Sequence, residues 1–442
     1  MKLKSSRRKF VKQSSLIAGG LLAAPMFGRA NFFSGAAGEI KVAVIGCGGR
    51  GTGAALQALL SKQNVKIVAL ADAFKDRIDD CYNRLVADDL SDMGVTGNMK
   101  AKVDVPESRK FTGFDAYQKA ISFADVVILA TPPGFRPIHF EEAIKQGKHV
   151  FMEKPVAVDP AGVKKVLDAA AIAKQKKLNV VVGLQRRYQN SYRELFKRKE
   201  MIGDILSGQV WWNNPGVWVK KREPNQTEME YQMRNWYYFN WLCGDHILEQ
   251  HIHNIDVMNW FKNSFPVRAQ GMGGRQVRTG KEYGEIFDHH YVEFWYADGS
   301  VMNSQCRHIP GAASKVDELL IGTKGKIYCG EGSIRDNKGK ELFKFDSKGG
   351  NNPYQTEHDE LFAAIAKGQY KFADAEFGAK STLTAVMGRM ATYSGQVIDW
   401  DKTLNSGIDI MPKEYSWTAT PPTVPNADGF YPIAVPGKTK YF

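Results

Sequence analysis

Lys41-Val-Ala-Val-Ile-Gly-Cys-Gly-Gly-Arg-Gly-Thr-Gly53 decides the fold of this 442-residue chain. An apolar run, Val42 to Ile45, leads directly into Gly46-x-Gly48-x-x-Gly51, and a helix-compatible segment (54–60) follows. In such a strand–turn–helix unit the first glycine makes the tight turn. The second lets the backbone approach a pyrophosphate, and the third lets the helix pack closely on the strand. The helix N-terminus adds N–H groups and a positive dipole end, so the stretch predicts a dinucleotide-binding turn.

A second apolar run strengthens the prediction, because a glycine triplet alone is weak evidence for a dinucleotide-binding turn. Val65 to Ala71 ends in Asp72, 21 residues after Gly51, where a carboxylate that binds the ribose is expected. This acid favours NAD, whereas Lys75 and Arg77 just beyond it could accommodate the 2′-phosphate of NADP. The sequence leaves the two cofactors open and leans towards NAD.

Residues 1–36 are predicted to be a twin-arginine signal peptide outside the fold. Ser6-Arg-Arg-Lys-Phe-Val-Lys12 carries the arginine pair, an interrupted apolar segment (16–27) follows, and small residues (35–37) suit cleavage. The apolar segment is too short for a membrane span, and a disordered basic tail is the alternative. The twin-arginine translocase exports folded proteins, so we expect a periplasmic protein that carries a tightly bound cofactor.

Composition narrows the class of partner. The chain is 43% hydrophobic and 24% charged, which is typical of a soluble globular protein, and its length allows two domains. Residues 1–30 hold seven of the cations and no acid, which leaves +6 of the total +13 for the rest. That charge is spread along the chain, so no nucleic-acid partner is expected. The five cysteines form no CxxC pair, which disfavours a disulfide framework or a zinc site.

The first domain is predicted to be an α/β Rossmann domain over residues 37–185. A buried strand ends at Thr131-Pro132, and another, His149 to Met152, ends at Glu153-Lys154. Because ligands of parallel sheets bind at the carboxyl ends of the strands, these residues are expected beside the cofactor. The predicted cofactor-binding residues are Gly46, Gly48, Gly49, Arg50, Gly51, Asp72, Thr131, Pro132, Glu153 and Lys154.

The second domain is predicted to be an α+β domain over residues 186–400, with a large open, mostly antiparallel sheet. Two strand-like runs, 286–296 and 300–308, flank Ala297-Asp-Gly299, which has the chemistry of a hairpin turn. A second hairpin follows at 318–329, and strands in succession without intervening helices indicate one sheet. Residues 401–442 are expected to form an extended arm across the surface or a partner subunit.

Several of these motifs together resemble the glucose–fructose oxidoreductase/inositol dehydrogenase (Gfo/Idh/MocA) family. They are the glycine loop, the loop at Thr131-Pro-Pro133, Glu153-Lys-Pro155, and a later Glu249-x-x-x-His253-x-x-Asp256. The resemblance implies an N-terminal domain that binds NAD or NADP, a second domain against the nicotinamide, and a homo-oligomer, either a dimer or a tetramer. It also implies that Lys154, Glu249 and His253 act on a substrate hydroxyl, although Glu249 stands where aspartate is usual.

The residues themselves support that chemistry. One helix from Leu242 to Phe261 would place His246, Glu249, His253 and Asp256 on one face, which would line a polar cleft. Oxidation of an alcohol by hydride transfer needs a base, for which His253 is the candidate; Glu249 would orient it and Lys154 would donate to the reacting oxygen. The histidine spacing does not suit zinc, so no metal is predicted. A purely structural stripe is the remaining alternative.

Substrate contacts are predicted from Arg187, Tyr188, His246 and Asp256. An aromatic-rich region (211–241) suits the apolar faces of sugars, although such clusters also form ordinary core. Three functions therefore stand: an oxidoreductase acting on a sugar, glycoside or polyol; a redox-neutral glycosidase or lyase with retained NAD; and a non-catalytic carbohydrate-binding protein. The intact Glu153-Lys-Pro155 favours the first.

Overall fold

The computed structural model describes residues 38–441. The predicted signal peptide falls within residues 1–37, which lie outside the described residues. Across residues 38–441, no helix has the length and apolar character needed to cross a membrane.

The first domain is built on a six-stranded sheet that is parallel throughout, as predicted. Its strands lie in the order β3-β2-β1-β4-β5-β6. Their bounds are β1 (Ile40–Ile45), β2 (Val65–Asp72), β3 (Lys110–Thr112), β4 (Val126–Leu129), β5 (His149–Met152) and β6 (Val180–Val182). The helices that connect them are α1 (Gly49–Leu60), α2 (Lys75–Leu85), α3 (Ala116–Ser122), α4 (Arg136–Lys145) and α5 (Pro160–Gln175). Apart from the edge strand β3, the strands are almost wholly buried, as expected for a parallel sheet covered on both faces.

The second sheet has nine strands and is antiparallel except for one parallel pair, β7 with β10. Its order is β14-β13-β12-β11-β7-β10-β9-β8-β15. The strands are β7 (Ile205–Asn214), β8 (Arg268–Gly274), β9 (His289–Trp295), β10 (Val301–His308), β11 (Lys315–Gly322), β12 (Gly325–Tyr328), β13 (Ser333–Asp336), β14 (Glu341–Lys344) and β15 (Ile398–Asp399). Both predicted hairpins are confirmed, β9 with β10 and β11 with β12. The predicted fold class is therefore confirmed.

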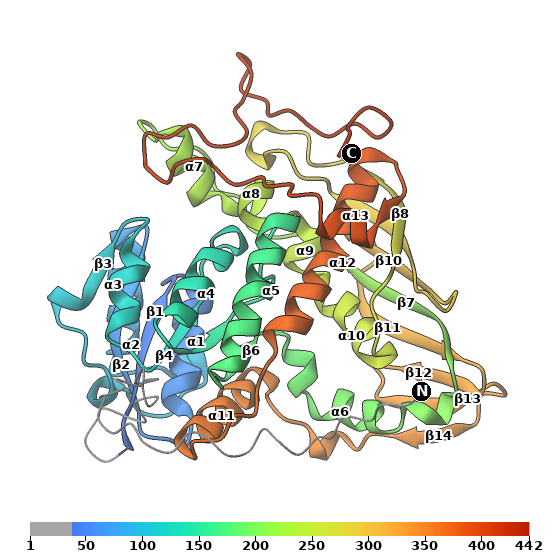
Figure 1. Cartoon of the computed structure of the whole chain (residues 1–442), viewed down its shortest axis with the longest axis horizontal. Helices are drawn as coiled ribbons and strands as arrows, with labels where there is room; N and C mark the ends of the chain where they lie inside the picture. Colours follow the sequence, from blue (N-terminus) through green and yellow to red (C-terminus); the bar gives the residue numbers. More distant parts are fainter. Residues whose placement is uncertain (1–37, 442) are drawn as a thin grey trace, which may run out of the picture.

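Helices join the two sheets (Figure 1). The second domain begins with α6 (Asn190–Lys197), and α10 (Ile252–Lys262) packs on β7 and β11. The long helix α12 (Ala375–Ser394) packs on both α5 and β8, so it belongs to both halves of the molecule. α11 (Pro353–Ala366) returns to the first domain and packs on α1, where Gln355 Nε2 donates to Gln57 O at 2.9 Å.

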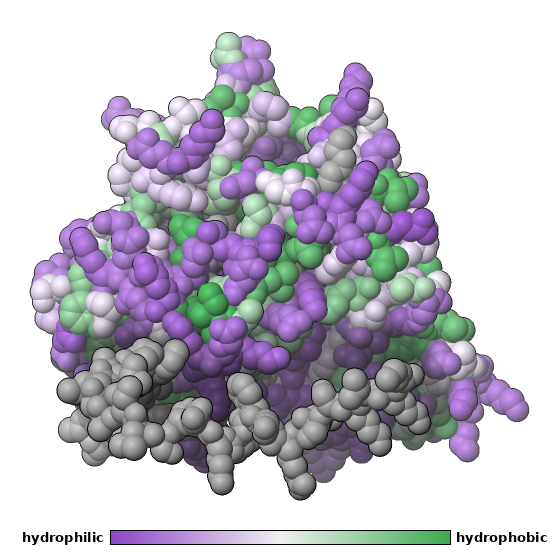
Figure 2. All heavy atoms as spheres, in the orientation of Figure 1, coloured by the Kyte–Doolittle hydropathy of each residue, from purple (hydrophilic) through white to green (hydrophobic). Residues whose placement is uncertain are grey.

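After the short helix α13 (Trp400–Leu404), the described chain to residue 441 contains neither helix nor strand. This arm crosses the molecule above α7 (Glu228–Arg234) and α8 (Asn240–Cys243) (Figure 1). It is fixed there because Tyr431 Oη donates to Glu228 Oε1 at 2.5 Å and Gln232 Nε2 donates to Thr423 O at 2.7 Å. Hydrophilic side chains cover most of the face seen in the same orientation, with hydrophobic ones scattered between them (Figure 2).

Candidate active site

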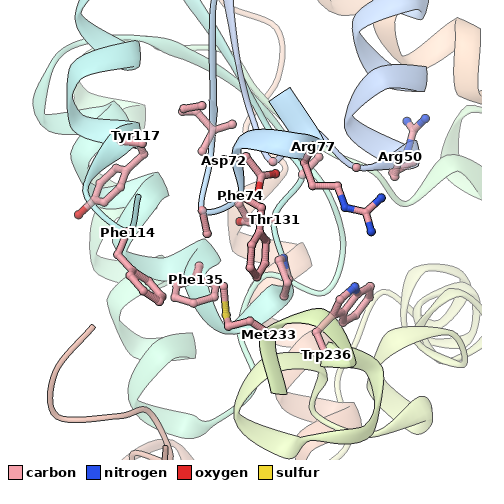
Figure 3. Close-up of a pocket in the computed structure, with 18 of the residues that line it drawn as sticks. Arg50, Asp72, Phe74, Arg77, Phe114, Tyr117, Thr131, Phe135, Met233 and Trp236 are labelled. Carbon is pink, nitrogen blue, oxygen red and sulfur yellow. Dashed lines mark hydrogen bonds between the residues drawn. The ribbon is translucent and has the colours of Figure 1, made fainter. Parts of the chain in front are cut away.

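A cavity of about 590 Å³ opens at the carboxyl ends of β1, β2 and β4. The glycine loop, Asp72 and the Thr131-Pro132 loop line it, so the structure brings these predicted residues together (Figure 3). Glu153 and Lys154 do not line this cavity. They follow β5, the next strand of the sheet.

The glycine loop has the geometry that a dinucleotide requires. Gly46 has φ +92°, and a Cβ on it would lie 2.4 Å from Thr131 N. A Cβ on Gly51 would lie 1.8 Å from Gly46 O, so neither position admits a side chain. Gly48 and Gly49, in contrast, would have nothing within 4 Å of an added Cβ. These two glycines leave open space at the N-terminus of α1, where a pyrophosphate fits.

Asp72 is held at the end of β2 by two backbone donors. Its Oδ2 accepts from Cys47 N at 2.7 Å and its Oδ1 accepts from Phe74 N at 3.0 Å. Burial raises the pKa of this carboxyl, and the two backbone hydrogen bonds oppose that shift. Each carboxylate oxygen retains a lone pair for a ribose hydroxyl, so the group fits the adenosine side of NAD.

Arg50 belongs to the glycine loop, but its guanidinium has protein partners. It pairs with Glu153 and lies 3.6 Å from the buried Glu357 of α11, while Nη1 donates to Gln57 Oε1 at 3.0 Å. Figure 3 shows its head group directed away from Asp72 and Phe74. Arg50 therefore ties the glycine loop to β5 and α11.

Lys154, Glu249 and His253 form a second group of ionisable side chains at the end of β5. Lys154 Nζ contacts both the backbone oxygen of Glu249 and, at 3.2 Å, its Oε1. Burial and the nearby Lys154 ammonium lower the pKa of His253 well below its usual value, so this imidazole is neutral near pH 7. Its ring stacks on Trp212 with centroids 5.9 Å apart.

This group contains buried polar atoms without hydrogen-bond partners among the described residues. They are Glu249 Oε2, His253 Nδ1 and Trp212 Nε1. Buried polar atoms are almost always paired in folded proteins, and exceptions concentrate where a ligand or water completes the bonding. The group therefore has the character of a polar binding site.

Comparison with known proteins assigns the first domain. Residues 40–184 match the model of an oxidoreductase family with an NAD-binding Rossmann fold, Gfo/Idh/MocA. Residues 40–184 are therefore similar to the NAD-binding domain of this family. NAD is thus the cofactor of this domain, in agreement with the prediction.

Relatives and solved structures extend the comparison. The chain is 29% identical to inositol 2-dehydrogenase of Serratia proteamaculans over 54% of its own length and 65% of that protein. It is 26% identical to 2,7-anhydro-N-acetylneuraminate hydratase of Escherichia coli over 46% of its own length and 50% of that protein. The chain thus spans about half to two thirds of the length of these curated relatives. Scyllo-inositol dehydrogenase from Lactobacillus casei, solved with NAD(H) and scyllo-inositol, shares the fold at a TM-score of 0.60 and 17% identity, over 82% of this chain and 99% of that one.

The predicted continuous helix over 242–261 is wrong, since the Gfo/Idh/MocA-like motif lies on two helices, α9 (His246–Glu249) and α10. His251 N donates to His246 O instead of to the carbonyl four residues back, which breaks the helix between them. The residues of the motif therefore do not form one stripe. Glu249 and His253 remain near Lys154, whereas His246 and Asp256 turn into the protein core.

The four predicted substrate-binding side chains have protein partners. Arg187 pairs with Asp256 at 2.7 and 2.9 Å, and Ser381 Oγ also donates to Asp256 at 2.7 Å. Tyr188 is buried and its Oη donates to Asp374 at 2.7 Å. The Arg187–Asp256 pair and its Ser381 partner link the segment after β6 to α10 and α12.

His246 is fully buried and its Nδ1 lies 2.8 Å from Asp245 Oδ1. With His290 these two side chains place ligand atoms within 4.8 Å of one another. Asp245 Oδ2 already accepts from Phe287 N at 2.9 Å and Tyr393 Oη at 2.5 Å. Hydrogen bonds within the core therefore hold the Asp245 carboxylate.

The outer wall of the NAD cavity was not predicted from the sequence. Five residues of the second domain line the cavity: Trp218, Lys220, Met233, Arg234 and Trp236. Figure 3 shows Met233 and Trp236 at this wall. Arg234 pairs with Asp76 of α2 at 2.7 and 3.0 Å and lies 3.8 Å above the Phe74 ring. The arm supports this wall, because Trp417 lies 5.0 Å from Phe74 between ring centroids. The aromatic-rich composition of 211–241 was the available signal.

Proposed function

We propose that the protein is an NAD-dependent oxidoreductase that transfers hydride between the nicotinamide and a CH–OH group of a sugar, glycoside or polyol. The observation that carries the proposal is the partly buried group of Lys154, Glu249 and His253, with its unpaired polar atoms, at the strand next to the NAD cavity. The similarity to inositol 2-dehydrogenase supports a polyhydroxylated substrate. The backbone-held Asp72 supports NAD over NADP.

Lys154, His253 and Glu249 each have a separate role in the proposed hydride transfer. Bound NAD supplies the hydride acceptor. Lys154 donates a hydrogen bond to the reacting hydroxyl and stabilises negative charge that develops on its oxygen. Neutral His253 takes the hydroxyl proton, and Glu249 holds the Lys154 ammonium in place. In the reverse direction the same groups return the proton to a carbonyl oxygen.

A redox-neutral reaction is the second candidate. The similarity to the Escherichia coli hydratase favours it, because hydration leaves the substrate with no net change in oxidation state. Lys154 and His253 would then serve a transient oxidation followed by re-reduction on one retained NAD. The two candidates differ in whether reduced nicotinamide accumulates.

The predicted location and assembly belong to the same proposal. Residues 1–36 would direct export of the folded, NAD-loaded protein to the periplasm. The wall formed by the second domain and the arm supports tight retention of NAD, because it covers the cavity from outside. Homo-oligomers, dimers or tetramers, are proposed from the family resemblance.

The test uses the full-length protein with NAD and four probes: myo-inositol, scyllo-inositol, D-glucose and methyl glucoside. Reduced nicotinamide should form with at least one probe, and Lys154→Met should slow its formation by about 100- to 1,000-fold while NAD still binds. Lys165→Met is the matched control, because within residues 38–441 the Lys165 ammonium pairs only with the exposed Glu141. Consumption of a probe without reduced nicotinamide would favour the redox-neutral reaction.

A further inference from the structure

Tyr237 is a buried side chain to which the proposed mechanism gives no role. It lies in the short helix Trp236–Tyr238, directly after α7, and only 3% of it is exposed. Its hydroxyl has no hydrogen-bond partner among the residues that the structure describes. The backbone at this position is fixed, since Cys243 Sγ donates to Tyr237 O at 2.8 Å.

The ring contacts of Tyr237 link it to two residues that line the NAD cavity and, through His308, to the residue that follows Glu249. On one side its ring contacts Trp218 and Trp236, which both line the cavity, with centroids 6.2 and 5.6 Å away. On the other side it stacks on His308 at 6.0 Å. His308 Nε2 in turn lies 2.7 Å from the side-chain oxygen of Gln250, the residue after Glu249.

The charge environment keeps the phenol protonated. Burial, and after it the Glu249 carboxylate, raises the pKa of Tyr237 well above its usual value. A buried hydroxyl that stays protonated and has no acceptor in the protein can donate to an acceptor on a bound ligand. Glu249 Oε2 and His253 Nδ1 also have no hydrogen-bond partner among the described residues, and the Glu249 carboxylate is close enough to act electrostatically on the Tyr237 phenol.

We propose that Tyr237 is a specificity-determining residue whose hydroxyl donates a hydrogen bond to a substrate hydroxyl next to the one that reacts. The inference rests on the proposed function and adds a polar contact to it. The substrate class is a polyol or sugar ring with adjacent hydroxyls, one held by Lys154 and His253 and its neighbour by Tyr237.

The adjacent tyrosine provides a matched control. Tyr238 is also buried, but its hydroxyl donates to the backbone oxygens of Trp218 at 3.0 Å and Val217 at 3.3 Å. Removing the Tyr238 hydroxyl breaks bonds within the protein. Removing the Tyr237 hydroxyl breaks none.

The experiment compares Tyr237→Phe and Tyr238→Phe in the full chain with NAD, using the probe that gives the highest rate with the unmodified protein. Tyr237→Phe should keep its melting temperature and NAD affinity and lose roughly 10-fold in kcat/KM. Tyr238→Phe should lower the melting temperature and change kcat/KM less. With deoxy analogues of the probe, each lacking one hydroxyl beside the reacting carbon, one analogue should react equally with unmodified protein and Tyr237→Phe.

The outcomes separate this inference from the function on which it rests. If Lys154→Met reacts slowly while Tyr237→Phe reacts normally, or if no analogue removes the difference between Tyr237→Phe and unmodified protein, the Tyr237 assignment is overturned and the oxidoreductase remains. If Tyr237→Phe unfolds at a lower temperature with unchanged kcat/KM, its role is structural. If the unmodified protein reduces NAD with none of the four probes, the proposed function and this inference both fail.

Discussion

Replacing Arg234 with alanine removes two interactions that hold the outer wall of the NAD cavity. The guanidinium pairs with Asp76 of α2 at 2.7 and 3.0 Å and lies 3.8 Å above the Phe74 ring. Arg234 and Phe74 both line the cavity, so the variant opens the wall beside the ligand. NAD should therefore bind more weakly and leave faster.

The exposure of the Arg234 and Asp76 side chains sets how much binding free energy Arg234→Ala loses. The Arg234 and Asp76 side chains are 27% and 51% exposed, so water screens the ion pair, which contributes about 0.2 to 1 kcal/mol. The cation–π contact adds about 0.5 to 1 kcal/mol at a partly exposed site. Together the loss is about 0.7 to 2 kcal/mol, or about 3- to 30-fold in the dissociation constant of NAD. Most of this change should appear in the dissociation rate.

The assay measures NAD binding and release through the fluorescence of the tryptophans that line the cavity. Asp76→Asn removes only the ion pair and should weaken binding by no more than about 5-fold. Arg222→Ala is the matched control, because Arg222 pairs with Glu228 and lies 4.1 Å from the Tyr231 ring but does not line the cavity. Equal NAD release from Arg234→Ala and unmodified protein, or an equal effect of Arg222→Ala, would refute the reasoning.

Three further predictions concern the glycine loop, the proposed catalytic residue Lys154 and a buried acid. Gly51→Ala should abolish NAD binding and destabilise the fold, because its Cβ would lie 1.8 Å from Gly46 O, whereas Gly49→Ala should weaken NAD binding without lowering the melting temperature. Lys154→Met should lower kcat/KM by about 100- to 1,000-fold with little change in NAD affinity, measured by steady-state kinetics and titration. Burial raises the pKa of Asp374 to about 6, so the folded protein binds a proton at this carboxyl more tightly than the unfolded chain does. The stability that this proton contributes is lost as the pH rises through about 6. The free energy of unfolding of Asp374→Asn, measured in urea relative to that of the unmodified protein, should therefore rise by about 2 kcal/mol from pH 4 to pH 8. A difference between the two proteins that does not change with pH would contradict this.

The first domain could be predicted because its motif is local. The atoms that leave no room for a side chain at Gly51 belong to the same strand–turn–helix unit, and those at Gly46 belong to the loop after the neighbouring strand, at Thr131. The hairpins of the second sheet were also local, and Gly299 takes the left-handed conformation that the Asp-Gly turn requires.

The helix break, the pairing of the polar side chains and the position of residues 353–374 depend on contacts that sequence patterns do not show. Sequence periodicity could not show that His251 would bond to His246 and break the helix, or that Asp256 would be paired by Arg187. The sequence analysis places residues 353–374 in the second domain because they follow its strands along the chain. In the structure Val180 N donates to Phe372 O at 3.0 Å, which places that segment beside β6.

The measurement that tests the central claim most directly is the near-ultraviolet absorbance of the NAD-loaded protein, followed while each of the four probes is added. The account predicts that the reduced-nicotinamide band grows with at least one probe and grows about 100- to 1,000-fold more slowly in Lys154→Met, which still binds NAD. A band that stays flat with all four probes in the unmodified protein would contradict it, as would equal growth in Lys154→Met.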